Sequence, residues 1–269
     1  MEERPIWLPN GVDLETPSAA RCYDYYLGGA HNFAVDRELA RKVEAVVPTV
    51  RELAQHNRAF LRRVVRHLLD LGVRQFLDIG SGIPTAGNVH EIAQRFDPTA
   101  RVVYVDNEPV AVAHSETILE GNENADVVRA DLADVSGVLD SPQVKGLLDF
   151  DQPVAVLMIA LLHFVPESQR PEEILRAYRD RLSPGSYLGL SHASSDNHPE
   201  LLESIIALYR ESSNPVVSRT REEVVDLMSP FELVEPGVVY VPEWHPDSPE
   251  DVAADPSRSI VYGVLGRRI

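Results

Sequence analysis

The chain after Gly72 alternates short apolar segments with segments of helical spacing, and this alternation constrains the fold more than any other feature. Strands covered by helices on both faces are apolar throughout, whereas a helix that covers a sheet is apolar along one side. A repeat of these two kinds of segment is typical of a doubly wound parallel sheet. The predicted strands are 75–79, 101–105, 126–129, 154–158 and 187–191, and the predicted helices are about 85–96, 109–119, 171–182, 200–210 and a short one after Thr220.

The end of the chain predicts a different kind of strand pairing. Segments 231–241 and 259–265 have strand composition, and a loop rich in proline and acidic residues separates them. This spacing suits an antiparallel pair at the sheet edge. We therefore predict an α/β fold with a doubly wound, Rossmann-like, mostly parallel seven-stranded sheet that ends in an antiparallel edge pair.

The N-terminal part lacks this alternation. Residues 1–17 resemble an extended lead-in, and the helical patterns at 36–46 and 49–71 are separated by Pro48. We expect residues 1–72 to form an N-terminal lid and helical cap, and residues 73–269 to form the Rossmann-like core.

A tyrosine-rich stretch at 21–33 has two interpretations. Tyrosines beside the flexible Gly28-Gly29 pair suit a lid over a ligand, which Tyr25, Tyr26 and His31 would enclose. The alternative is a short helix with tyrosines in the core and the glycine pair as its C-cap. Asn57, on the apolar stripe of the next helix, is likewise either a structural hydrogen-bonding residue or a group that faces the pocket.

The charge of the chain limits the classes of partner. Its 269 residues include 42 acidic and 25 basic side chains, for a net charge of −17, so a nucleic-acid substrate is not expected. Cys22 has no second cysteine to pair with, and the N-terminus lacks the apolar run of a secretory signal. The longest apolar run, 154–162, is too short to span a bilayer. We expect a cytoplasmic protein that does not bind membranes; the sequence does not indicate its oligomeric state.

The stretch Phe76 to Thr85 predicts a ligand site at the end of the first strand. Gly80-x-Gly82 allows a sharp turn and leaves room for a ligand against backbone N–H groups. Asp78, Asp106 and Asp131 each fall near the end of one of three successive strands. In a parallel sheet these ends share one edge, where ligands bind. Asp106 is placed to accept hydrogen bonds from ribose hydroxyls, and Asp131 from an adenine amino group, with Leu132 packing on the ring.

Together these motifs resemble a known family. Asp78-x-Gly80-x-Gly82, Asp106, Asp131 and the Pro184-Gly185 turn resemble the class I S-adenosylmethionine-dependent methyltransferases. The segments 23–29, 57–61 and 76–85 are more closely similar to an actinobacterial S-adenosyl methyltransferase family formerly catalogued as a domain of unknown function.

The resemblance implies S-adenosylmethionine as cofactor and a role for each motif residue. Gly80 and Gly82 would line its methionine part, Asp78 would act on the amino group directly or through water, Asp106 would hold the ribose, and Asp131 with Leu132 would hold the adenine. Pro84 replaces the third glycine of the general pattern and removes an N–H donor, so Thr85 would supply a hydroxyl contact and cap the next helix. The residues expected at the cofactor are Asp78, Gly80, Gly82, Pro84, Thr85, Asp106, Asn107, Asp131 and Leu132.

Histidines near the strand ends are candidates for acid–base chemistry. His163, just after the fourth strand, is predicted to be a catalytic base or a contact near the cofactor; the alternative is that it caps the following segment. His192 is a second candidate. His90-Glu91 and the His245–Asp247 segment lack the convergent spacing of a metal site, so none is expected.

The sequence thus predicts a methyltransferase that acts on an unidentified acceptor, expected to be a small molecule. One alternative is an S-adenosylmethionine-binding regulator or partner subunit without catalysis. Another is an NAD-dependent dehydrogenase, although its fingerprint requires a small residue where Thr85 stands and has no use for Asp78 or Asp131.

Overall fold

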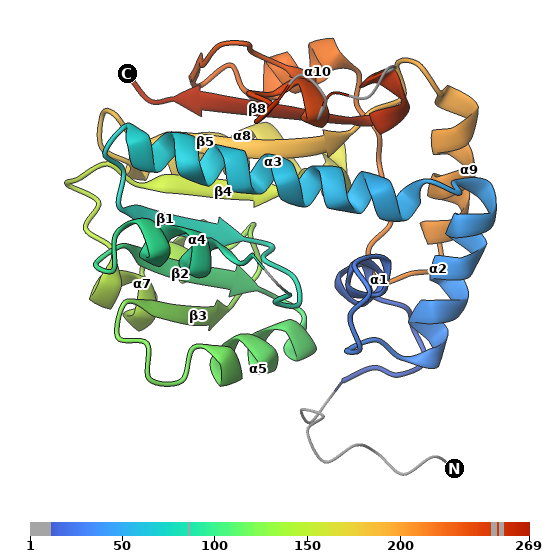
Figure 1. Cartoon of the computed structure of the whole chain (residues 1–269), viewed down its shortest axis with the longest axis horizontal. Coiled ribbons are helices and arrows are strands. Elements are labelled where there is room, and N and C mark those ends of the chain that lie inside the picture. Colours follow the sequence, from blue (N-terminus) through green and yellow to red (C-terminus); the bar gives the residue numbers. More distant parts are fainter. Residues whose placement is uncertain (1–11, 86, 249–251, 253–255) are drawn as a thin grey trace.

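The computed structural model describes residues 12–85, 87–248, 252 and 256–269, and its centre is one eight-stranded sheet (Figure 1). The strand order is β3-β2-β1-β4-β5-β8-β6, and β7 also pairs with β8. The first five strands are parallel, and the order reverses between β1 and β4, which is where such sheets bind ligands. These strands are β1 (Gln75–Ile79), β2 (Arg101–Asp106), β3 (Ala125–Arg129), β4 (Ala155–Ile159) and β5 (Tyr187–Ala193).

The antiparallel edge is confirmed, with one more strand than predicted. β8 (Val261–Arg267) runs antiparallel to β5. The single strand predicted at 231–241 is two short strands, β6 (Glu232–Leu233) and β7 (Val239–Tyr240), which both pair with β8. A turn divides them because Gly237 has a φ of 79° and donates its N–H to the Val234 carbonyl.

Helices cover both faces of the sheet, as the apolar strands require. On one face Phe76 and Leu157 pack with α3 (Val50–Asp70), which crosses the sheet in Figure 1. On the other face the alternate strand residues Leu77 and Met158 pack with a second set of helices. The first layer also includes α4 (Val89–Phe96) and α5 (Pro109–Ile118), and the second consists of α6 (Val135–Leu139), α7 (Pro142–Leu147), α8 (Pro171–Arg181) and α10 (Arg221–Leu227).

A helical cap lies beyond the carboxyl ends of the parallel strands (Figure 1). It consists of α1 (Ala19–Tyr26), α2 (Ala34–Val46) and α9 (Pro199–Tyr209). Leu39, Val43, Leu202 and Tyr209 belong to one buried cluster, so a helix from the later part of the chain completes the cap. The division at residue 72 stays a prediction.

The tyrosine-rich stretch forms the short helix α1, with Gly28 (φ 82°) directly after its C-cap residue. Inside the cap, Arg21 and Asp36 form a buried ion pair of 2.8 Å.

Within the described residues, no helix has the length and hydropathy needed to cross a membrane. The short 3₁₀ turns are η1 (Leu162–Phe164), η2 (Glu167–Gln169), η3 (Val241–Glu243) and η5 (Pro256–Ser259).

Candidate functional site

The turn after β1 depends on both of its glycines. Gly80 and Gly82 have φ values of 68° and 67°, which L side chains rarely adopt. A Cβ on Gly80 would lie 2.4 Å from Leu161 Cδ1, so Gly80 also allows the segment after β4 to approach closely. Gly82 donates its N–H to Asp106 Oδ2 over 2.7 Å, which ties the turn to the end of β2.

The helix after this turn begins later than predicted, so Thr85 does not cap it. α4 starts at Val89, and its capping box pairs Asn88 with Glu91. Gly87 has a φ of 79°, which is outside the helical range, so α4 does not extend back from Val89 to Thr85. Asn88 is the N-cap residue of α4, and its Oδ1 accepts from the Thr85 N–H at 3.2 Å.

Asp78 presents a buried carboxylate at this turn. The residue is 5% exposed, and no group in the described part of the chain donates a hydrogen bond to its carboxylate. Burial raises its pKa to about 7, Arg58 opposes this rise, and Asp106 adds to it. A buried carboxylate is costly without a donor, so this one is suited to a cationic ligand group.

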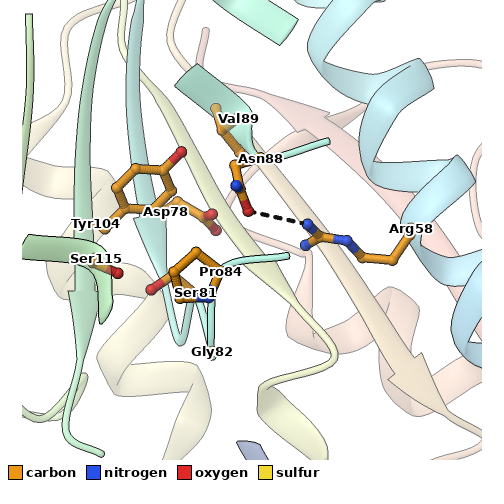
Figure 2. Close-up of a pocket in the computed structure, with 9 residues that line it drawn as sticks. All are labelled: Arg58, Asp78, Ser81, Gly82, Pro84, Asn88, Val89, Tyr104 and Ser115. Carbon is orange, nitrogen blue, oxygen red and sulfur yellow. Dashed lines mark hydrogen bonds between the residues drawn. The ribbon is translucent and has the colours of Figure 1, made fainter. Parts of the chain in front are cut away.

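A small pocket of about 10 Å³ adjoins Asp78, at the lower limit of the space that one water needs. Figure 2 shows Arg58 reaching from α3 toward Asn88, whose Oδ1 accepts from Arg58 Nη2 at 3.4 Å. Pro84 lines this small pocket.

Asp106 is the last residue of β2 and is held in place by backbone groups. Its Oδ1 accepts from the Glu108 N–H at 2.8 Å, and its Oδ2 accepts from Gly82. Burial raises its pKa to about 6, and these hydrogen bonds limit the rise. Glu108 also pairs with Arg21 at 3.3 Å, which connects this end of β2 to the cap.

Asp131 and Leu132 follow β3 at the same sheet edge. Asp131 is exposed, and its Oδ1 accepts from the Ala133 N–H at 2.8 Å. The Leu132 carbonyl accepts from the Tyr178 hydroxyl at 3.0 Å. The Ala130 N–H donates to the Asp106 carbonyl at 3.1 Å, so this segment lies beside the end of β2.

A cavity of about 720 Å³ joins these residues to the cap. This volume falls within the range of small-molecule sites. Of the predicted cofactor residues, Pro84 and Thr85 lie outside its lining. Those that line it are Asp78, Gly80, Gly82, Asp106, Asn107, Asp131 and Leu132.

The predicted lid residues do not all line the cavity. Tyr26 lines the cavity. Tyr25 is outside its lining and packs against the Arg51 guanidinium, 4.6 Å from the ring centre. His31 is also outside the lining, and its ring lies 3.6 Å from that of His114.

His163, in the 3₁₀ turn after β4, lines the cavity and caps no helix with its side chain. Its Nδ1 is buried without a hydrogen-bond partner in the described structure. Burial, with a smaller effect from Arg219, lowers its pKa to about 4, so the imidazole is neutral at pH 7. A neutral imidazole in a cavity wall can accept a proton.

His192 has a structural role instead. It is fully buried, and its Nε2 lies 2.7 Å from Arg219 Nη1. Since arginine only donates, Nε2 is the acceptor, and Nδ1–H donates to the Ala193 carbonyl at 2.8 Å. Arg219 also donates to the Leu162 and Val165 carbonyls at 3.0 Å, so this pair holds the segment that carries His163.

Sequence reasoning missed Tyr23 and Arg219. Tyr23 lines the cavity, and its hydroxyl accepts from Asn57 Nδ2 at 3.0 Å. Asn57 lines the cavity too, so both of its proposed roles apply. No motif marks Arg219, because its partners lie far away in the sequence.

Among the described residues, no group of three His, Cys, Asp or Glu side chains is arranged to hold a metal ion.

Comparison with known proteins identifies the family. The model of the S-adenosyl methyltransferase family matches residues 5–269. A proposed methyltransferase from Thermobifida fusca is 38% identical, with a TM-score of 0.92 over 98% of this chain and 99% of that one. A DUF574 family protein from Streptomyces avermitilis is 36% identical, with a TM-score of 0.91 over 96% of this chain and 99% of that one.

More distant structures share the fold alone. The pyocyanin biosynthetic protein PhzM is 20% identical, with a TM-score of 0.51 over 87% of this chain and 61% of that one. None of the curated proteins compared with the chain matches it. The family match decides against the dehydrogenase alternative.

Proposed function

Because the chain belongs to the S-adenosyl methyltransferase family, we propose that this S-adenosylmethionine-dependent methyltransferase acts on a small molecule bound under the α1–α2–α9 cap. The observation that carries the proposal is the buried Asp78 carboxylate, which has no hydrogen-bond donor among the described residues and lies in the wall of a cavity that extends to the cap. The residues present fit the cofactor, because its cationic amino group would pair with the Asp78 carboxylate.

Each part of the cofactor has a proposed partner. Asp78 would hold the methionyl amino group, and the turn from Gly80 to Gly82, which has open space at Gly82, would lie along the methionyl chain. Asp106 would accept from the ribose hydroxyls, because each carboxylate oxygen retains a lone pair beyond its backbone bond. Asp131 and Leu132 would contact the adenine. When bound, the cofactor supplies an electrophilic methyl group on a sulfonium.

His163 is the proposed catalytic residue. Its neutral imidazole would take the proton of a hydroxyl acceptor as that oxygen bonds to the methyl carbon. The enclosing cap would exclude water and orient the acceptor, and positioning of this kind is the main help that such a displacement needs.

The net charge of −17 supports a small-molecule acceptor over a nucleic acid. The lone, buried Cys22 is consistent with a reducing, cytoplasmic location.

Calorimetric titration of the full chain with S-adenosylhomocysteine tests the cofactor site. Wild type should bind, Asp78→Ala should bind at least about 10-fold more weakly, and NAD should not bind. A chain that binds S-adenosylhomocysteine but transfers no label from methyl-labelled S-adenosylmethionine to any compound in a small-metabolite extract would favour the non-catalytic alternative.

A further inference from the structure

The two ends of the 720 Å³ cavity differ in chemistry. Its charged lining residues are Arg58, Asp78, Asp106, Glu108 and Asp131, and they lie at the strand ends and the adjoining part of α3. The cap end is lined by apolar side chains from α2, α3, α9 and the segments around 216 and 260. Val43, Leu53, Leu202, Val216 and Ile260 line it and belong to the buried cluster of the cap, and Ile205 packs against that cluster.

The tyrosine hydroxyls of the cap end already have hydrogen-bond partners. The hydroxyls of Tyr26 and Tyr209 lie 3.4 Å apart. Tyr23 donates its hydroxyl to the Ala54 carbonyl at 3.1 Å and accepts from Asn57. A carboxylate, phosphate or ammonium group there would lose its hydration, because the charged lining residues lie at the other end of the cavity and none of the described residues that line the cap end is charged.

Aromatic rings lie where the two ends meet. The Phe164 ring centre is 4.4 Å from that of His163 and 6.3 Å from that of Tyr209. A flat apolar molecule at this point would contact these rings and place a polar substituent beside His163.

We infer, on the basis of the proposed function, that the methyl acceptor is an uncharged, largely apolar ring compound whose body packs against α9 and Phe164 and whose nucleophilic atom lies beside His163. The charge of the whole chain would attract a cation. The apolar cap end of the cavity, and not the net charge of the chain, must therefore exclude cationic acceptors.

Three probes that share a naphthalene ring and differ in charge test this inference: 2-naphthol, 2-naphthoate and 2-naphthylmethylammonium. Each is titrated into the full chain, saturated with S-adenosylhomocysteine, at about 0.15 M salt to screen the net charge. We expect 2-naphthol to bind at least about 10-fold more tightly than either ion. Equal or tighter binding of either ion, or no binding of 2-naphthol, overturns the inference.

A pair of variants on α9 locates the site. Ile205 lines the cavity, whereas Ile206 has the same intermediate burial but lies outside the lining. Ile205→Lys should weaken 2-naphthol binding at least about 10-fold and strengthen 2-naphthoate binding, and Ile206→Lys should change neither. Equal effects of the two variants contradict the location. The wild-type probe comparison stands if either variant fails to fold.

The same titrations separate the inference from the function on which it rests. Failure of S-adenosylhomocysteine to bind the wild-type chain would overturn the proposed function. Normal binding of S-adenosylhomocysteine with no preference for the uncharged probe would overturn the inference alone.

Discussion

Ser191 on β5 donates its hydroxyl hydrogen to Asn57 Oδ1 on α3 over 2.6 Å. Asn57 donates in turn to Tyr23 on α1, and the Ala160 N–H donates to Ser191 at 2.9 Å. Ala160 has a φ of 54°, unusual for a residue other than glycine. One chain of hydrogen bonds therefore connects the cap to the segment after β4 that leads to His163.

Replacing the central member of this chain should destabilise the fold. Asn57→Ala leaves Ser191 and Tyr23 without their partner, so we expect the free energy of unfolding to fall by about 1–3 kcal/mol. Chemical denaturation measures the change. Gln55→Ala, on the exposed side of the same helix, is the control and should change stability by less than about 0.5 kcal/mol. Similar losses in both variants would contradict the role of Asn57.

The Asp78 carboxylate should lower the free energy of unfolding of the cofactor-free chain, although it supports cofactor binding. Its pKa is raised from 3.8 to about 7, so the folded chain binds more protons between these values and stability falls as pH rises through them. Asp78→Asn should stabilise the cofactor-free chain at pH 8 by up to about 2–4 kcal/mol. Thermal unfolding at pH 4 and pH 8 checks this, with the exposed Asp70→Asn as control.

Cofactor affinity should have the opposite pH dependence. The neutral acid that forms below about pH 7 cannot pair with an ammonium group, so the affinity for S-adenosylhomocysteine should fall as pH is lowered from 8 to 6. Asp78→Asn should bind weakly and lose most of this dependence. A wild-type affinity that does not change over this range would contradict the pairing.

The two neighbouring histidines should fail in different ways. His163→Gln should reduce methyl transfer by about 10²–10⁴-fold and leave stability and S-adenosylhomocysteine affinity unchanged. Because its pKa is near 4, the wild-type rate should not decline through His163 titration between pH 8 and 5. His192→Gln should mainly lower stability, since it disturbs the Arg219 contact. Full methyl transfer by His163→Gln would remove His163 from the mechanism.

The close approach at Gly80 predicts a steric cost. Gly80→Ala adds a methyl group that conflicts with Leu161 and a backbone conformation that alanine disfavours, so it should cost more than about 2 kcal/mol. Gly121→Ala is the matched control, because its φ of 82° is similar but the added Cβ meets nothing within 4 Å. Equal losses of stability in denaturant titrations would show that conformation alone accounts for the effect.

The sheet could be predicted from the sequence because each strand carries its own signal. Phe76 and Leu77 face opposite layers of helices, so both must be apolar, and the same holds along β4. The predicted start of α4, at about residue 85, was wrong. Pro84 is a strong local signal for the start of a helix, whereas the positive φ of Gly87 cannot be read from the sequence.

The candidate site could be predicted only where motifs are local. The residues after β1, β2 and β3 follow from position on the sheet edge. The pairing of His192 with Arg219, the packing of Tyr25 against Arg51 and the cap contacts of α9 depend on tertiary packing, which the periodicity of one segment does not encode.

The cap takes α2 from the start of the chain and α9 from its later part, whereas the proposed cofactor residues lie in one stretch, 78–132. Changes in α9 can therefore alter which acceptors fit while the stretch that would hold the cofactor remains as it is. On the proposed placement of cofactor and acceptor, the choice of substrate and the binding of the cofactor would be encoded in separate parts of the chain.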